Sequence, residues 1–175
     1  KQAQVYLRQG MYREATVPTR KIVEIRDTKD DWLLLADLYA RINDLNGMGE
    51  AVFKAIKKDS TDADAIYRYA NVLYDMQDYQ EAIPYLEQAV ELFPEDDIVV
   101  SNLVSAYQQT GQIAQAIENY EAIVKKDKNN INARLNLANM YLSAAKDAEK
   151  EGKTKTASSY KQKATKEYNA VVKID

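Results

Sequence analysis

The chain repeats itself with a period of 34 residues, and this periodicity restricts the fold more than any other feature of the sequence. Residues 63–96 and 97–130 align in register, and residues 29–62 follow the same frame. Each unit contains two stretches in which apolar residues recur three and four positions apart, with a short polar break between them. This spacing predicts two amphipathic helices per unit. Because one helical hairpin cannot bury its apolar faces alone, we expect an all-α array of stacked hairpins.

The repeat frame divides the chain into five segments. We expect a partial repeat over residues 1–28, followed by repeats at 29–62, 63–96, 97–130 and 131–175. The last repeat is longer than the others, because 14 additional residues separate its two apolar stripes. This length corresponds to about two extra turns in each helix, so its hairpin should project about 10 Å beyond its neighbours.

The elongated hairpin is rich in charged residues on either side of a turn expected at 151–154. Lysines alternate along it with a few acidic residues, among them Glu149 and Glu167. A docking surface for a partner is one interpretation of this pattern. A soluble extension with a solvated charged face is the interpretation that we favour.

Composition excludes most kinds of catalytic and metal sites. The 175 residues include no Cys and no His, so the chain has no disulfide, thiolate nucleophile, imidazole base or ordinary zinc ligand set. The segment Gly47-Met48-Gly49 lacks the Lys-Ser/Thr of a phosphate-binding loop. Carboxylate pairs at 30–31 and 96–97 fall at expected turns, where acids cap helices and stay solvated. We therefore predict a protein that is not an enzyme and holds no metal or cofactor.

Charge is distributed unevenly around a net of −3. Residues 1–28 carry a net charge of +3, residues 29–130 carry −10 and residues 131–175 carry +4. The acidic centre favours a partner with basic character, although an ordinary solvated surface has the same composition. No apolar run approaches the length of a membrane-spanning helix. The chain starts with Lys and stops mid-pattern, so we expect a piece of a longer array or, alternatively, self-association through an uncapped C-terminal face.

The pattern resembles the tetratricopeptide repeat, in which large and small apolar residues recur at fixed offsets. The second full unit follows it through Tyr69, Ala70, Leu73, Tyr79, Ala82, Leu86, Ala89 and Pro94. The resemblance covers nearly the whole chain and implies a right-handed α-solenoid. Small alanines should lie where helices approach closely, and Tyr39, Leu73, Tyr107 and Tyr141 should fill the space between hairpins. Gly47 and Gly49 depart from the pattern and predict a weaker second helix in that unit.

The resemblance also implies a binding face, because the first helix of each hairpin lines the concave side of such arrays, where partner peptides bind. By position, this face comprises Leu33, Asp37, Arg41, Tyr67, Asn71, Tyr74, Ser101, Ser105, Leu135 and Asn139. The amides of Asn71 and Asn139 are suited to holding a peptide backbone. Tyr67 and Tyr74 are suited to anchoring a partner, unless they pack only against the adjacent helix.

Two specialised kinds of partner are not expected. Some family members bind chaperone C-termini through a carboxylate clamp of Lys, Asn and Arg. Here only Asn71 matches that set, and Asp37 would repel a terminal carboxylate. Related arrays that read RNA use basic grooves, whereas the expected groove is acidic, so RNA binding is a minor alternative.

The sequence therefore predicts a non-catalytic scaffold that binds a partner protein or extended peptide. The alternative from another class is a structural spacer or self-association module of a larger protein.

Overall fold

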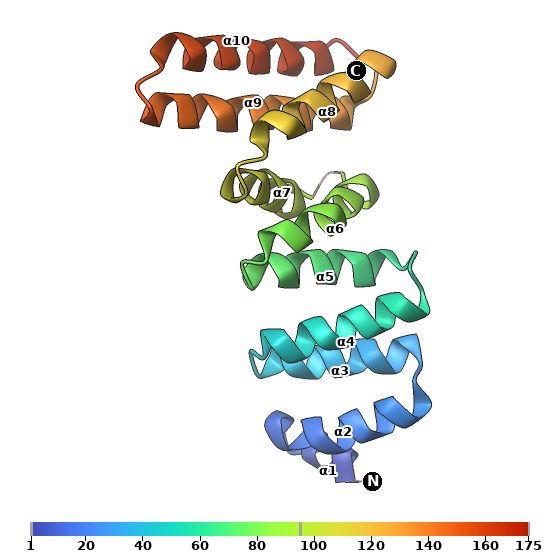
Figure 1. The fold of residues 1–175 in the computed structure, drawn as a ribbon. Helices are drawn as coiled ribbons and strands as arrows, with labels where there is room; N and C mark the ends of the chain where they lie inside the picture. Colours follow the sequence, from blue (N-terminus) through green and yellow to red (C-terminus); the bar gives the residue numbers. More distant parts are fainter. Residues whose placement is uncertain (1, 95, 175) are drawn as a thin grey trace. The chain divides into compact units, whose positions relative to one another are not determined.

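The computed structural model describes residues 2–94 and 96–174, and this part of the chain contains ten α-helices and no strand. Figure 1 shows the helices in chain order. The helices are α1 (Gln2–Arg8), α2 (Tyr12–Arg26), α3 (Lys29–Arg41), α4 (Leu45–Lys58), α5 (Ala63–Asp75), α6 (Tyr79–Leu92), α7 (Asp97–Gln109), α8 (Ile113–Lys126), α9 (Ile131–Lys150) and α10 (Thr154–Val171). The expected all-α architecture of helical hairpins is confirmed.

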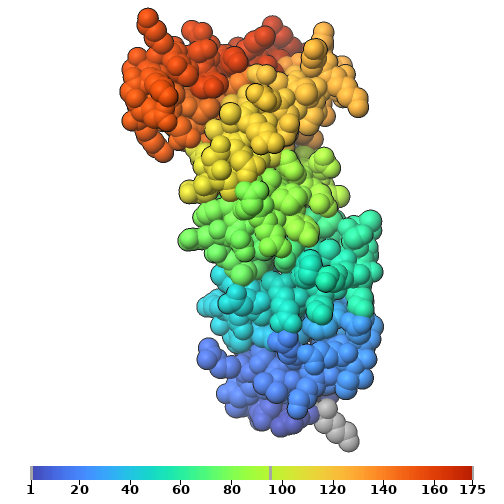
Figure 2. All heavy atoms as spheres, in the orientation of Figure 1, coloured from blue at the N-terminus to red at the C-terminus, as the bar shows by residue number. Residues whose placement is uncertain are grey.

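The chain divides into two compact units, unit 1 (residues 1–92) and unit 2 (residues 93–175). Within each unit, every helix packs against the next helix in the sequence, and in unit 2 α7 also contacts α9. In the space-filling view of Figure 2, side chains fill the spaces that separate the ribbons of successive helices within each unit. None of the helices in the described residues combines the length and the apolar character needed to cross a membrane.

The helix starts recur with the period of the sequence. Thr28, Asp62, Asp96 and Asn130 stand 34 residues apart, and each side chain accepts a hydrogen bond from a backbone N–H in the first turn of the helix that follows. Such caps satisfy amide groups that have no partner inside the helix. Polar residues at the expected turns therefore fix where α3, α5, α7 and α9 begin.

The turn inside each hairpin also has a fixed conformation. Gly10, Asn43, Gln77, Gly111 and Gly152 each follow the first helix of a hairpin closely, and all have positive φ angles between 56° and 73°. Left-handed residues of this kind commonly end helices. At positions 43 and 77 a non-glycine residue adopts the conformation that glycine adopts at position 111.

The predicted core positions are buried. Tyr39, Leu73, Tyr107 and Tyr141 are at most 7% exposed. The small residues that we expected at close helix approaches are fully buried, namely Ala36, Ala70, Ala82, Ala116 and Ala138. One expectation about acidic residues is wrong. Asp31 is buried rather than solvated, because it accepts a hydrogen bond from the Thr28 hydroxyl at 2.6 Å and pairs with Arg26 at 3.0 Å.

The last hairpin is the longest. Helices α9 and α10 contain 20 and 18 residues, whereas α3 to α8 contain 13 or 14 each. Their turn contains Gly152 at a φ of 73°. The two helices are joined by ring packing of Tyr141 on Tyr160, with centroids 6.0 Å apart, and by an ion pair of Lys161 with Glu149 at 2.6 Å.

The cap of α5 supports a prediction about acid stability. Asp62 accepts from Lys29 Nζ at 2.5 Å and from the backbone N–H of Ala65 at 2.8 Å, and these bonds lower the pKa of Asp62 below its ordinary value of 3.8. A carboxyl with a lowered pKa in the folded state stabilises the fold above its ordinary pKa, and this stabilisation is lost as the pH falls. Asp62→Asn should therefore lower the free energy of unfolding at pH 7, and the deficit should shrink below about pH 4. Urea unfolding at pH 7, 5 and 3 measures this difference, and an equal deficit at all three values would contradict the assignment.

Candidate functional site

A groove of about 330 Å³ lies between α7 and α9 in unit 2. Both helices are the first of their hairpins, so the groove lies on the face where the sequence places partner binding. It is lined by Asp97, Val100, Ser101, Val104, Ser105, Gln108, Asn139, Leu142, Ser143 and Lys146. The structure therefore brings together Ser101, Ser105 and Asn139 from the predicted set. Leu135 is half-buried on α9 and is not part of this lining.

Hydrogen bonds hold two amides of the groove in place. The Tyr168 hydroxyl of α10 donates to Asn139 Oδ1 at 2.7 Å. Gln108 donates from Nε2 to Asp147 at 3.1 Å, which ties α7 to α9. Tyr168 engages the oxygen of Asn139, and the Nδ2 group has no hydrogen-bond acceptor among residues 2–94 and 96–174.

Ser143 is the unusual residue of the groove. Its side chain is 6% exposed, and its Oγ has no hydrogen-bond partner within residues 2–94 and 96–174. A buried hydroxyl without a partner costs free energy, so most such groups in folded proteins are paired. Ser143 Oγ is therefore a buried hydroxyl with unused hydrogen-bonding capacity beside the groove.

The groove carries opposite charges on its two helices. Asp97 is the first residue of α7, and Lys146 lies in the last turns of α9. Because α7 and α9 both precede the returning helix of a hairpin, they run in the same direction. The two charges therefore mark opposite ends of the groove.

The corresponding face of unit 1 is formed by α3 and α5. Tyr67, Asn71 and Tyr74 are half-buried on α5, and all three engage in contacts with neighbouring residues. The ring of Tyr74 packs edge-on against Tyr79 of α6, with centroids 5.3 Å apart. Part of the tyrosine surface therefore packs within the hairpin, as the alternative interpretation states, and part remains accessible.

One ion pair joins α5 to α3 on this face, and a second lies within α5. Arg68 of α5 binds Asp37 at 2.6 Å and Asp64 at 2.9 Å, so both carboxylates already have a cationic neighbour. Leu33 is half-buried beside them. Arg41 is exposed and stacks over the Tyr12 ring at 5.2 Å.

Asp37 and Arg41 also border a small cavity of about 130 Å³ among α1, α2 and α3. The cavity is otherwise lined by Leu7, Thr19, Leu34 and Leu38. In unit 1, Asp37 is thus paired with Arg68, whereas Thr19 Oγ1 in the wall of this cavity is buried without a hydrogen-bond partner in the described residues.

Sequence reasoning missed Arg68, Ser143 and Lys146. Arg68 carries a sequence signal, since Asp64 stands four residues before it on the same helix. Ser143 is equivalent to Gln109, the last residue of α7, but nothing in the repeat pattern marks it as a binding residue. Lys146 lies beyond the last position at which a 34-residue repeat ends its first helix, so the other first helices contain no equivalent of it. Within the described ranges, no group of three or more acidic side chains is arranged to hold a metal ion.

The hairpins, their turn geometry and the face of first helices define a helical-repeat protein. Two family models described as tetratricopeptide repeat match the chain, one over residues 73–118 and one over residues 101–154. The chain is a tetratricopeptide repeat protein.

Curated relatives support the same family. The type IV pilus assembly protein PilF of Pseudomonas aeruginosa is 30% identical over 138 residues, which is 77% of this chain and 55% of PilF. The TPR repeat-containing thioredoxin TTL4 of Arabidopsis thaliana is 27% identical over 84 residues, which is 48% of this chain and 12% of TTL4. The chain therefore spans about half the length of PilF and a small part of TTL4.

Solved structures share the fold. MamA from Desulfovibrio magneticus RS-1 superposes with a TM-score of 0.58 at 22% identity, covering 96% of this chain and 92% of MamA. YrrB, described as a TPR protein with an unusual peptide-binding site, superposes with a TM-score of 0.57 at 19% identity, covering 99% of this chain and 82% of YrrB. Tetratricopeptide repeat proteins generally act as non-catalytic interaction scaffolds, and this chain has the architecture of one.

Proposed function

We propose that the chain binds an extended segment of a partner protein along the face of its first helices, and that the groove between α7 and α9 is the main contact in unit 2. The unpaired Ser143 hydroxyl in the groove wall is the observation that carries this proposal. An extended peptide exposes backbone N–H and C=O groups along its whole length, and side-chain hydroxyls and amides can pair with both.

Different residues of the groove would supply hydrogen bonds, apolar contacts and charges to such a segment. Asn139 Nδ2 supplies a hydrogen bond to the peptide backbone, and Ser143 Oγ supplies another once the side chains that cover it move aside. Val100, Val104 and Leu142 supply apolar contact. Asp97 favours a basic group at one end, and Lys146 favours an acidic group at the other. The expected basic character of the partner thus applies to one end of the segment.

Ser143→Ala provides the decisive test. Selection of a random peptide library displayed on phage, against the natural chain, supplies the peptide probe. The affinity of the selected peptide should fall about fivefold in Ser143→Ala, because a hydrogen bond to a buried hydroxyl contributes about 1 kcal/mol. The free energy of unfolding should stay equal or rise, since the variant removes a buried group without a partner.

The matched control is Ser159→Ala, which removes an exposed hydroxyl on α10. It should leave both affinity and stability unchanged. Peptides that bind Ser143→Ala as tightly as the natural chain would show that the groove is not the binding site.

The alternative of a structural spacer is tested with the same probe. Replacing Tyr67, Asn71 and Tyr74 together by Ala measures the contribution of unit 1 to binding. A binding scaffold loses affinity in this variant while it stays folded. A spacer yields no enriched peptide and fails only when packing is broken, for example by Ala70→Glu at a fully buried position.

The relatives suggest the setting in which such binding operates. PilF is named for type IV pilus assembly, so we propose that the partner here is also a component of a multiprotein assembly. We favour binding of a different protein over self-association through α10, for a reason that lies in the surface of this helix. The exposed positions of α10 are mainly polar, as at Ser158, Gln162, Thr165 and Asn169. Absence of nucleic-acid binding stays a prediction.

A further inference from the structure

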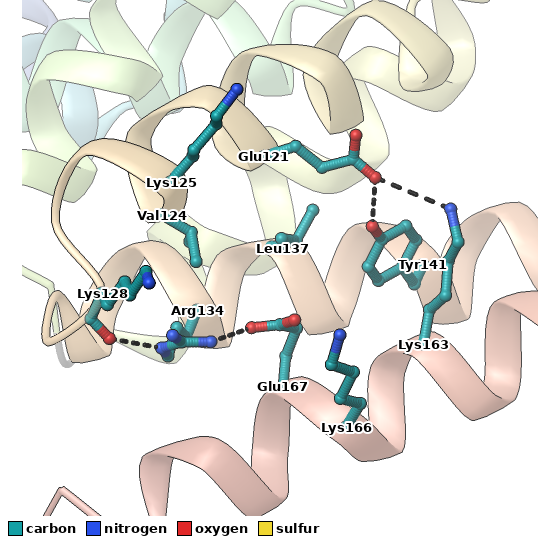
Figure 3. A pocket seen from close by; sticks show the side chains of 10 residues that line it. All are labelled: Glu121, Val124, Lys125, Lys128, Arg134, Leu137, Tyr141, Lys163, Lys166 and Glu167. Carbon is teal, nitrogen blue, oxygen red and sulfur yellow. Dashed lines mark hydrogen bonds and ion pairs between the residues drawn. The ribbon is translucent and has the colours of Figure 1, made fainter.

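A second pocket, of about 390 Å³, lies on unit 2 between α8, α9 and α10. Figure 3 shows that its side chains come from these three helices and from the loop between α8 and α9. It shares no lining residue with the groove between α7 and α9. The pocket is lined by Glu121, Val124, Lys125, Lys128, Arg134, Leu137, Tyr141, Lys163, Lys166 and Glu167.

The base of this pocket is apolar and closely packed. Leu137 is 2% exposed, Tyr141 is 4% exposed and Val124 is 8% exposed. The hydroxyl of Tyr141 donates to Glu121, and Lys163 Nζ lies 5.1 Å from the centre of its ring. Burial and the hydrogen bond to Glu121 raise the pKa of Tyr141, so the phenol stays neutral. The Tyr141 ring itself is buried, with Lys163 over it.

Positive charge exceeds negative charge around this base. Five cationic side chains line the pocket, against two carboxylates. Both carboxylates are engaged, since Glu167 pairs with Arg134, and Glu121 accepts from Tyr141 and pairs with Lys163 at 3.6 Å.

Three lysines remain without a partner in the part of the chain that the structure describes, namely Lys125, Lys128 and Lys166. Figure 3 shows them on separate elements of the pocket, with Lys128 in the loop. Arg134 fixes that loop, because its Nε donates to the carbonyl oxygen of Lys128 at 2.8 Å. Unpaired cations around an apolar base match a ligand that carries negative and apolar groups side by side.

We propose that this pocket binds an acidic peptide segment of a partner protein, with its carboxylates on Lys125, Lys128 and Lys166 and an apolar side chain over Val124, the least buried of the apolar residues at the base. Charge complementarity selects this occupant. A single-stranded nucleic acid is a poorer match, because its bases need an open aromatic face and the Tyr141 ring is buried. The pocket is a second interaction surface, independent of the groove of first helices.

The test uses fluorescein-labelled decapeptides and fluorescence anisotropy at physiological ionic strength. A Glu/Leu alternating peptide should bind the natural chain, and its affinity should exceed that of a Glu/Gly peptide of equal charge at least fivefold. A Lys/Leu peptide should not bind. The double variant Lys125→Glu/Lys166→Glu should reduce the affinity for the Glu/Leu peptide more than tenfold.

The matched control is Lys126→Glu/Lys155→Glu, which changes the net charge equally at two exposed lysines outside the pocket. This control should change the affinity less than threefold. Equal losses in the two double variants, or equal binding of the Glu/Leu and Glu/Gly peptides, would mean diffuse attraction and would overturn the proposal. Tighter binding of a labelled single-stranded oligonucleotide through the same lysines would overturn it in favour of nucleic acid.

Discussion

Arg134→Met should destabilise the protein by about 3–5 kcal/mol, the cost of leaving a buried carboxylate without its partner. The side chains of Arg134 on α9 and Glu167 on α10 are 13% and 11% exposed and form an ion pair. Methionine keeps much of the length of the arginine stem but cannot neutralise Glu167. The variant also frees the Lys128 carbonyl that Arg134 holds at the start of the last hairpin. Urea unfolding followed by circular dichroism measures the loss.

A double-mutant cycle separates the ion pair from packing. Glu167→Met alone should also destabilise, because it leaves the guanidinium of Arg134 buried without its carboxylate. The double variant Arg134→Met/Glu167→Met should recover most of the lost stability, since a buried pair replaced by apolar groups of similar volume is often neutral. Losses that simply add in the double variant would show that the two residues act separately.

This pair illustrates where sequence reasoning stops. Glu167 was expected on the solvated face of the elongated hairpin, and the structure corrects this, because Glu167 is buried and faces Arg134. The two residues are 33 positions apart and lie on different helices. Nothing in the local pattern distinguishes Glu167 from Glu149, which stays exposed and pairs with Lys161. Whether a charged side chain is buried depends on which helix faces pack together, and here the packing of α9 against α10 buries Glu167.

Features that repeat were predictable, because the same physical requirement recurs every 34 residues. Buried alanines such as Ala70 and Ala116 follow from the close approach of neighbouring helices. A cap such as Asp96 follows from the need of each helix start for a hydrogen-bond acceptor. The positive φ of Gln77 was not predictable in the same way, because glycine stands at the equivalent position 111. The aligned position indicates the turn, and the fold imposes the conformation on a residue that does not prefer it.

The sequence predicted which helix face forms the candidate site, but not which of its side chains are paired and which are open to a partner. Ser101 and Asn139 line the groove of unit 2 as their repeat positions imply. The repeat frame says nothing about which hydroxyl is left without a partner, because that depends on the atoms around Ser143. It also does not reveal that Asp37 is paired with Arg68. Side-chain pairing across helices therefore determines which parts of the face are available to a partner.

Gly47→Ala should destabilise unit 1 by about 1–3 kcal/mol, the usual cost of overfilling a packed interior. A Cβ added at Gly47 would lie 2.5 Å from Cδ1 of the Tyr39 ring. That ring is 7% exposed, and its hydroxyl accepts from Arg20 at 3.4 Å, so it has little freedom to withdraw. From the sequence, Gly47 predicts only a weaker helix, and alanine there would be expected to stabilise α4 by about 1 kcal/mol. The structure reverses the sign of this expectation.

Two further variants decide between helix propensity and packing at this position. Asn46→Ala changes the exposed neighbouring residue in the same turn and should stabilise the protein by a few tenths of a kcal/mol, roughly the propensity difference between the two residues. In a Tyr39→Leu background the ring is absent, so Gly47→Ala should become neutral or stabilising relative to that background. If Gly47→Ala stabilises the natural chain when measured by urea unfolding, the close contact with Tyr39 does not govern this position. If Gly47→Ala destabilises the natural chain and stabilises the Tyr39→Leu variant, contact with the Tyr39 ring, and not helix propensity, decides what a side chain at position 47 does to stability.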